Sequence, residues 1–382
     1  MSDPTGSGST FYQTAPQPPE PVTPIERVHI DELLRSMAQQ QASDIHLKVG
    51  RPPVFRIHGE LIPQTAYAPL RTEDMERLYR QLTTPSQRAR FEQELELDLP
   101  YELEGVARFR VNIAKQRNTI TIVMRRLSLT IPSLEELRLP EICKELVMRP
   151  RGLILVTGPT GSGKSTTLAA MIDYLNEREA RRVVTIEDPI EYVFEDKKCF
   201  VTQRELGEDT PSFASALKHA LRQDPDVILV GEMRDLETIS AALTAAETGH
   251  LVLSTLHTAG AALTVDRIVD VFPPHQQQQV RIQLANILVG ILSQTLLPLV
   301  NGQGRVVAVE VMVATPAVRN LIRESKTHQL PGVIETSQRL GMQTLDQALL
   351  ALYQQGLVSL EDVLARAADP EHLRNLLSGP TF

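Results

Sequence analysis

A glycine-rich stretch near the middle of the sequence constrains the fold more than any other feature. It follows the apolar run 153–156 and precedes a helical apolar pattern at 168–172. It consists of Gly158, Pro159, Thr160, Gly161, Ser162, Gly163, Lys164, Ser165 and Thr166. Glycines let a backbone wrap around phosphate groups without Cβ clashes, and the N-terminus of the following helix attracts anions. The order of strand, loop and helix predicts a phosphate-binding P-loop, in which Lys164 contacts phosphate and Ser165 ligates Mg²⁺. The alternative is an ordinary Gly/Ser-rich turn, but the strand pattern before the stretch and the helix pattern after it disfavour this alternative.

The length of the chain predicts two domains. Its 382 residues are more than one hydrophobic core usually supports. Residues 1–26 are dominated by Ser, Thr, Gly, Pro and Gln, a composition that buries too little apolar surface to fold, so we expect a disordered tail there. Ile131-Pro132-Ser133 breaks the periodic pattern, because proline restricts the residue before it. We therefore predict a first domain at 27–130, a linker at 131–134 and a second domain at 135–382.

Charge and cysteine content exclude several functional classes. The formal net charge of −8 disfavours a partner held by a broad basic face, so we expect no nucleic acid. Only Cys143 and Cys199 are present, which indicates neither a disulfide framework nor a cysteine zinc site and favours a cytoplasmic location. No apolar run reaches the roughly 20 residues of a membrane span. We expect no direct membrane insertion, and any membrane role would be peripheral.

The first domain has the pattern of an α+β module. A helical apolar face begins at Ile30, and the later patterns predict a strand at 43–49, a strand with a turn in it at 54–61, two helices within 71–95 and antiparallel strands within 95–126. Arg110 and Arg125 lie on or beside these last strands. Arginines on a strand most often form a solvated face, and the residues alone favour that interpretation.

The second domain opens with a short helix pattern at 134–148 and then repeats the order of apolar strand and polar residues. This order occurs in the segments 182–189, 227–235 and 249–258. Because helical patterns separate the segments, they predict a mostly parallel, helix-covered sheet with the architecture of RecA-like motor domains. Glu187, Glu232 and His257 would then lie at the carboxyl edge of the sheet, where ligands bind. Each of them alone is better explained as a helix cap, a surface ion pair or a structural histidine. Together with the P-loop they predict a nucleotide site, with His257 as a sensor of the γ-phosphate.

The remainder of the chain is predicted to be helical, over about 276–370. The predicted helices lie at 276–297, 317–325, 344–354 and 360–367, with Gly and Pro between them. Amphipathic patterns of this kind ordinarily pack against a core.

Four segments carry a resemblance to a known family. They are 185–191, which looks like an Asp box, 221–235, which looks like a Walker B signature, 249–258, which looks like a His box, and 317–324. With them, about residues 27–367 resemble the secretion-type (type II/IV) hexameric ATPases and, within these, the PilT family of type IV pilus retraction ATPases. The last segment is similar to the motif that marks retraction ATPases, with Val318 in place of a commoner isoleucine.

The resemblance implies a fold, an activity and partners. The fold would be α/β: a smaller PAS-like α+β domain, then a RecA-like P-loop ATPase domain, then C-terminal helices. The activity would be ATP hydrolysis with Mg²⁺, which powers pilus retraction and twitching motility by domain rotation. The chain would form a homo-hexamer in the cytoplasm, held peripherally at the inner membrane face by a pilus platform protein and the pilus machinery.

The resemblance also implies roles for the site residues. Glu187 would orient or deprotonate the attacking water, and Glu232 would act around Mg²⁺, although which of the two is the general base stays open. Arg110 and Arg125 match a pair of arginines that reach the γ-phosphate from a neighbouring position in the ring. Such charges suit phosphoryl transfer, which depends mainly on positioning and electrostatic stabilisation.

Three other functions compete with pilus retraction. A pilus-assembly or type II secretion ATPase commonly carries a four-cysteine zinc module and a longer amino-terminal extension, and this sequence has neither. A non-hydrolysing regulatory scaffold has no use for the residues that activate water. A DNA-translocating ATPase is disfavoured by the acidic balance of the chain.

Overall fold

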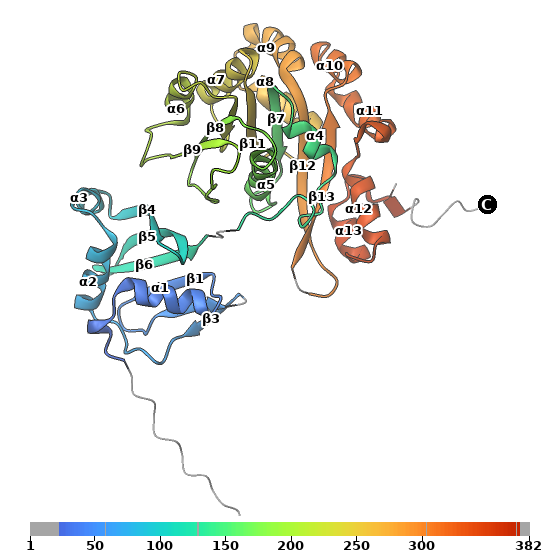
Figure 1. Cartoon of the computed structure of the whole chain (residues 1–382). Coiled ribbons are helices and arrows are strands. Elements are labelled where there is room, and N and C mark those ends of the chain that lie inside the picture. Colours follow the sequence, from blue (N-terminus) through green and yellow to red (C-terminus); the bar gives the residue numbers. More distant parts are fainter. Residues whose placement is uncertain (1–22, 58, 128–129, 303, 372, 375–382) are drawn as a thin grey trace, which may run out of the picture. The chain divides into compact units, whose positions relative to one another are not determined.

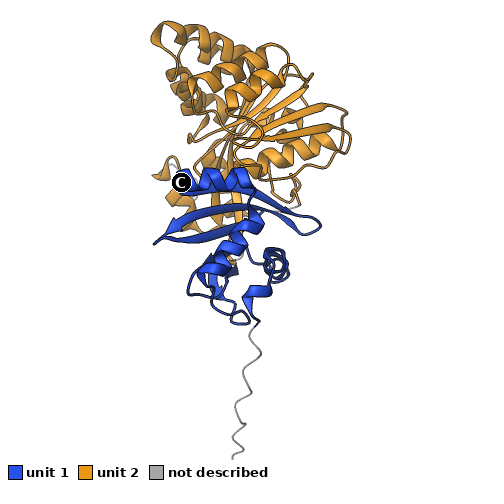
Figure 2. Ribbon diagram, turned by 90° about the vertical axis from the view of Figure 1, so that its left-hand side faces the viewer, with its two compact units in different colours: residues 1–127 blue, residues 128–382 orange. Residues whose placement is uncertain are grey.

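The computed structural model describes residues 23–57, 59–127, 130–302, 304–371 and 373–374 (Figure 1). The chain forms two compact units, 1–127 and 128–382, which Figure 2 distinguishes by colour. Each unit is described by itself. The tail predicted at 1–26 lies outside the described residues up to residue 22, and a short 3-10 helix, Ile25–Arg27, belongs to the first unit.

The first unit is built on a six-stranded antiparallel sheet with the order β3-β2-β1-β6-β5-β4. The strands are β1 (Asp44–Lys48), β2 (Val54–Ile57), β3 (Glu60–Pro63), β4 (Glu96–Leu103), β5 (Ala107–Gln116) and β6 (Thr119–Arg126). Buried residues alternate with partly buried or exposed ones along β5 and β6, because successive side chains of a strand point to opposite faces. One face therefore packs on a core, and the other is open to solvent.

Helices cover the core face of this sheet. They are α1 (Ile30–Gln39), α2 (Thr72–Leu82) and α3 (Pro85–Glu94). The apolar face predicted from Ile30 is buried, with Leu33, Leu34 and Met37 in the same core cluster. Helix α3 starts at proline after the N-cap Thr84, whose hydroxyl accepts a hydrogen bond from the Gln87 N–H, a pairing that fixes helix starts.

The second unit contains a seven-stranded sheet with the order β13-β12-β7-β11-β10-β8-β9. The strands are β7 (Gly152–Thr157), β8 (Arg182–Glu187), β9 (Phe200–Glu205), β10 (Val227–Val230), β11 (Leu251–Leu256), β12 (Leu288–Pro298) and β13 (Arg305–Val313). Neighbours pair in parallel except β12 and β13, which pair antiparallel. The expected α/β fold with a mostly parallel sheet is confirmed.

Helices pack on both faces of this sheet. They are α4 (Ile142–Val147), α5 (Lys164–Asn176), α6 (Phe213–Ala220), α7 (Leu236–Glu247), α8 (Ala261–Asp270), α9 (Pro274–Ile287), α10 (Pro316–Arg323), α11 (Leu330–Thr336), α12 (Leu345–Gln354) and α13 (Leu360–Arg366). Short 3-10 helices lie at Thr327–Gln329 and Gln338–Leu340. Leu153 packs in the cluster that contains α7 to α11, and its neighbour Ile154 packs in the cluster that contains α4 and α5. The sheet therefore separates two cores.

Two predicted helices are wrong in part. The helix predicted at 276–297 ends at Ile287, and β12 and β13 then form a hairpin that extends the sheet. The apolar run of β12 is buried on both faces over most of its length. The sequence of such a run shows no alternation of apolar and polar residues, so it cannot distinguish a strand from a helix. The region about 276–370 is thus not uniformly helical. In 134–148 only α4 is α-helical, and Pro140 precedes it.

Strand β9 was not predicted from the sequence. It lies at the edge of the sheet beside β8, and its residues include Phe200, Thr202, Gln203 and Arg204. Because an edge strand is partly exposed on both faces, its sequence need not alternate between apolar and polar residues. Only the pairing with β8 identifies this segment as a strand.

Candidate functional site

The P-loop connects β7 to α5 in the way the sequence predicts. Gly158, Gly161 and Gly163 have φ angles of 137°, 78° and 90°, in the left-handed region that favours glycine. A Cβ on Gly158 would lie 2.3 Å from the carbonyl oxygen of Gln294 and 2.7 Å from Ser162 Oγ. No side chain fits there, so the loop closes tightly against β12 only because residue 158 is glycine.

The loop presents positive potential. Helix α5 begins at Lys164 after Gly163, which has no side chain to cap the helix, and its first turn contains no acidic residue. Lys164 Nζ donates to the carbonyl oxygens of Gly158 and Pro159, each at 3.0 Å. Burial lowers the pKa of Lys164, whereas the charges of Glu232 and Glu191 raise it. An uncapped helix N-terminus beside a buried ammonium fits a phosphate group.

Other polar atoms of the loop also fit a phosphate ligand. Ser162 Oγ is buried and has no hydrogen-bond partner among the described residues. Ser165 is exposed on the first turn of α5, where its hydroxyl can reach a metal ion held by phosphate. Thr166 Oγ1 lies 3.0 Å from Tyr192 Oη, which connects the P-loop helix to the segment after β8.

A cavity of about 670 Å³ adjoins the P-loop. Its lining includes residues 161–167, Glu191, residues 136–138 and residues 304–307 at the start of β13. The volume is typical of small-molecule sites, which range from about 300 to 1,000 Å³. The cavity can therefore hold the nucleoside end of a nucleotide whose phosphates lie on the P-loop.

Glu187 ends β8 and is held by neighbouring side chains. Its Oε1 accepts hydrogen bonds from Thr185 Oγ1 at 2.7 Å and from Gln203 Nε2 at 3.1 Å. Burial raises the pKa of Glu187 to about 7, and these two hydrogen bonds oppose the rise because they favour the charged form. A carboxylate that gains and loses its proton near neutral pH suits a general base.

Glu232 follows β10 and lies beside His257, which follows β11. Arg234 Nε is 2.7 Å from Glu232 Oε1, and His257 Nε2 is 3.5 Å from Glu232 Oε2. The turn is fixed to β11, because Met233 N donates to the Thr255 carbonyl oxygen at 3.1 Å. The Glu232 carboxylate and the His257 imidazole thus lie together at the predicted edge of the sheet.

The structure places the sequence-predicted residues in two groups. The P-loop, Glu187, Glu232 and His257 lie at the carboxyl ends of the neighbouring strands β7, β11, β10 and β8. The second group, Arg110 and Arg125, belongs to the first unit, where the two residues are register partners across β5 and β6.

The pair of arginines lies on the solvent face of the first sheet. Both residues are exposed, and Arg125 Nε contacts the buried Asp44 carboxylate at 2.8 Å. The hydrogen bond and charge of Arg125 help to lower the pKa of Asp44, against the effect of burial. Like charges directly opposite each other on neighbouring strands destabilise a sheet, and the ion pair with Asp44 offsets part of this repulsion for Arg125.

Several residues around the site were not found from the sequence. Gln203 on β9 contacts Glu187, Tyr192 contacts Thr166, and Gln294 on β12 donates to Thr167 Oγ1 at 2.7 Å. No motif marks them, because each is defined by a pairing between strands or segments far apart in the sequence. These residues could not be identified from the sequence because the order of the strands in the sheet was not known.

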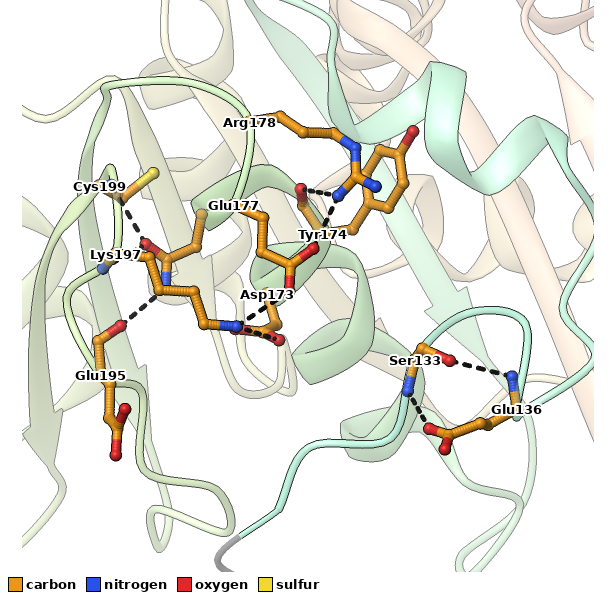
Figure 3. A network of polar contacts seen from close by, with 10 residues as sticks. Ser133, Glu136, Asp173, Tyr174, Glu177, Arg178, Glu195, Lys197 and Cys199 are labelled. Carbon is orange, nitrogen blue, oxygen red and sulfur yellow. Dashed lines mark hydrogen bonds and ion pairs between the residues drawn. The ribbon is translucent and has the colours of Figure 1, made fainter.

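The segment between β8 and β9 is attached to the C-terminal end of α5 (Figure 3). The Asn176 side chain donates to the Glu195 carbonyl oxygen at 2.8 Å and accepts from the N–H groups of Lys197 and Cys199, each at 3.1 Å. Lys197 Nζ contacts Asp173 at 2.9 Å and Glu177 at 3.1 Å. The segment that follows Glu187 is therefore fixed to the P-loop helix.

Figure 3 also shows a second pair of contacts, between Ser133 and Glu136. Ser133 N donates to Glu136 Oε2 at 2.8 Å, and Glu136 N donates to Ser133 Oγ at 3.1 Å. This reciprocal pairing fixes the turn at 133–136. Glu136 lines the cavity beside the P-loop, so the pairing also shapes one wall of the cavity.

Comparisons with known proteins show which family the chain belongs to. A family model described as "Type II/IV secretion system protein" matches residues 20–301. The chain is 51% identical to "Type IV pilus retractation ATPase PilT" of Pseudomonas aeruginosa, over 90% of this chain and 99% of that protein. It is also 51% identical to "Twitching motility protein" of Neisseria gonorrhoeae, over 84% of this chain and 86% of that protein.

A solved structure resembles this chain over most of its length. It is the crystal structure of the pilus retraction motor PilT with bound ADP, with a TM-score of 0.86 and 49% sequence identity. The match covers 91% of this chain and 99% of that one. In the part of the chain that the structure describes, we find no helix with the length and apolar character needed to cross a membrane.

Proposed function

This chain belongs to the type II/IV secretion system protein family, and we propose that it is an ATPase that powers type IV pilus retraction. One observation carries the proposal: the P-loop, Glu187 and Glu232 lie at the same edge of one sheet in a chain 51% identical to a retraction ATPase over most of its length. Pilus retraction by this ATPase then drives twitching motility of the cell.

The P-loop and the two carboxylates have different roles in ATP hydrolysis. The backbone N–H groups at the start of α5 and the Lys164 ammonium bind the β- and γ-phosphates. Mg²⁺, when bound through Ser165 and Glu232, would neutralise phosphate charge. Glu187 orients the attacking water and takes its proton as the new P–O bond forms and ADP leaves. His257, beside Glu232, responds to the γ-phosphate.

The two units take the roles of the family domains. The second unit is the RecA-like motor domain, within the proposed limits 135–382, and the smaller first unit is a PAS-like domain at 27–130. Residues 131–134 link them. ATP turnover rotates one domain against the other, and six subunits assemble into a ring that works on an inner-membrane platform protein of the pilus machinery. The ring is cytoplasmic, peripheral to the membrane and needs no nucleic acid.

Arg110 and Arg125 complete a site in the neighbouring subunit of the ring. Two exposed arginines in register with each other, one of them close to Asp44, form a compact cationic patch. Such a patch can stabilise the charge that develops on the transferring phosphoryl group, and an arginine supplied in this way is worth roughly a thousandfold or more in rate.

A single substitution tests the central proposal. Lys164→Ala should abolish ATP hydrolysis by the purified protein, because Lys164 binds phosphate, and should leave cells with excess, non-retracting pili. Lys218→Ala, on the exposed face of α6, is the matched control and should change neither property. Parent-like hydrolysis by Lys164→Ala would refute the assignment. Cells that lack pili altogether would favour the rival function, pilus assembly.

Mixed rings test the arrangement across subunits. Arg125→Ala should keep nucleotide binding and lose most hydrolysis. A ring that contains both Arg125→Ala and Lys164→Ala subunits should recover activity at those interfaces where an intact P-loop meets an intact arginine. If rings made only of Arg125→Ala subunits hydrolyse ATP at the parent rate, Arg125 has no part in hydrolysis and is a solvent-exposed strand residue.

A further inference from the structure

The side chain of Gln203 lies between Glu187 and the segment that follows β8. Strands β8 and β9 pair in parallel with Thr185 opposite Gln203. Gln203 Nε2 donates to Glu187 Oε1 at 3.1 Å and to the Tyr192 carbonyl oxygen at 2.8 Å. Gln203 Oε1 accepts from the Phe194 N–H at 2.9 Å. Both N–H groups and the oxygen of the amide are therefore used.

These three contacts fix the orientation of the amide. In the reversed orientation, the amide oxygen would face the Glu187 carboxylate and the Tyr192 carbonyl oxygen, and the NH₂ group would face the Phe194 N–H. All three contacts would then be repulsive. The amide oxygen would face two other acceptors, and the amide NH₂ group would face another donor. Glutamine is thus matched to this position by hydrogen bonding as well as by size.

Tyr192 extends the contact to the P-loop helix. Its hydroxyl lies 3.0 Å from Thr166 Oγ1, and Thr166 belongs to the first turns of α5, directly after Lys164 and Ser165. Gln203 therefore joins the Glu187 carboxylate to a segment that touches the nucleotide-binding loop.

We propose that Gln203 is a positioning residue for hydrolysis, which holds the Glu187 carboxylate in a fixed place relative to the P-loop. The inference rests on the proposed role of Glu187. Without Gln203, Thr185 Oγ1 and the Glu191 backbone N–H would still bond the Glu187 carboxylate, but the side-chain bridge from the carboxylate to Tyr192 and Phe194 would be lost. The attacking water would then meet a less well oriented base.

The same contact affects the protonation of Glu187. A hydrogen bond to the charged form lowers the pKa of a carboxyl group, and the Gln203 amide acts in this direction against burial. Two other carboxyl groups lie beside Glu187. The backbone N–H of Glu191 lowers the pKa of Glu187 while the Glu191 charge raises it, and Glu205 is the register partner of Glu187 on β9. The residue directly after β10, the uncharged Gly231, also lies beside Glu187. Loss of the Gln203 N–H should therefore raise the pKa of Glu187 further.

Gln203→Met tests the inference, because methionine has a similar length and cannot donate. Steady-state ATP hydrolysis is measured from about pH 6 to about pH 9, together with the binding of a fluorescent ADP analogue. We expect kcat to fall roughly tenfold near pH 7 and the acid limb of its pH profile to move upward by about one pH value. Binding of the ADP analogue should change less than about twofold.

Two further variants sharpen the test. Gln203→Glu keeps the shape of the side chain but brings a second carboxyl group to Glu187, so its acid limb should move at least as far, which also tests the inference if Gln203→Met does not fold. Gln343→Met is the matched control, because Gln343 is also partly buried and donates to a backbone carbonyl oxygen, that of Val309, at 2.8 Å. It should leave the profile unchanged.

The outcomes separate this inference from the proposed function. If the acid limb of the kcat profile does not move in either Gln203 variant, whether or not kcat falls, Gln203 only supports the fold. This result would overturn the inference but would leave the proposed ATP hydrolysis by the parent chain unaffected. A parent chain that hydrolyses no ATP would overturn both.

Discussion

Replacement of Glu187 by glutamine should stabilise the second unit at alkaline pH and have little effect near pH 5. Burial raises the pKa of Glu187 from 4.5 to about 7 in the folded chain. Between these two values the folded chain binds more protons than the unfolded chain, so its stability falls as the pH rises through this window. Above about pH 7 the ionised carboxylate costs the fold up to about 3 kcal/mol.

The glutamine side chain removes this cost and keeps the contacts. Its amide oxygen can still accept the hydrogen bonds that Thr185 and Gln203 now donate to Glu187 Oε1. The full 3 kcal/mol is an upper value, because Glu187 keeps some exposure to solvent and screening reduces the penalty. We expect the free energy of unfolding of Glu187→Gln to exceed that of the parent by about 1–3 kcal/mol near pH 8.5.

The assay is urea unfolding of the nucleotide-free chain at a series of pH values, with the difference between variant and parent taken at each pH. Glu208→Gln is the control, because Glu208 is exposed in the turn after β9 and its replacement removes the same formal charge. Hydrolysis by Glu187→Gln should be lost under all these conditions. A stability difference that is the same near pH 5 and near pH 8.5, or a destabilised variant at high pH, would refute the reasoning.

Two further predictions follow from the P-loop and its helix. Gly158→Ala should abolish nucleotide binding, because its Cβ would meet the Gln294 carbonyl oxygen at 2.3 Å, whereas Gly161→Ala, with open space around its Cβ, should keep binding and lose only about 1–2 kcal/mol of stability to its positive φ. Measurements of ADP binding and thermal unfolding on both variants check this, and equal losses of binding would contradict it. Asn176→Ala should cost about 2–4 kcal/mol, since it removes three hydrogen bonds to residues 195–199. Hydrogen exchange at Lys197 and Cys199 should rise, and unchanged protection would contradict the contact.

Local patterns in the sequence determined the parts of the fold that depend on near neighbours. The P-loop could be predicted because the strand, the glycines and the helix are adjacent in the chain, and each has its own local requirement. The helical face from Ile30 and the alternating strands of the first unit were predicted because burial on one side leaves a period of 3.6 or 2 residues. Glu187, Glu232 and His257 could be placed at one edge because parallel strands end on the same side.

Only the tertiary structure decided which strands lie side by side. The run 288–298 is buried on both faces and carries no period, so its place as β12 next to β7 had to come from the sheet. That placement brings the Gln294 backbone against Gly158, and the pairing of β9 with β8 brings Gln203 to Glu187. The raised pKa of Glu187 and the contact of Arg125 with Asp44 likewise depend on burial and on cross-strand neighbours. Such properties arise between residues distant in the chain, and a local pattern contains no information about them.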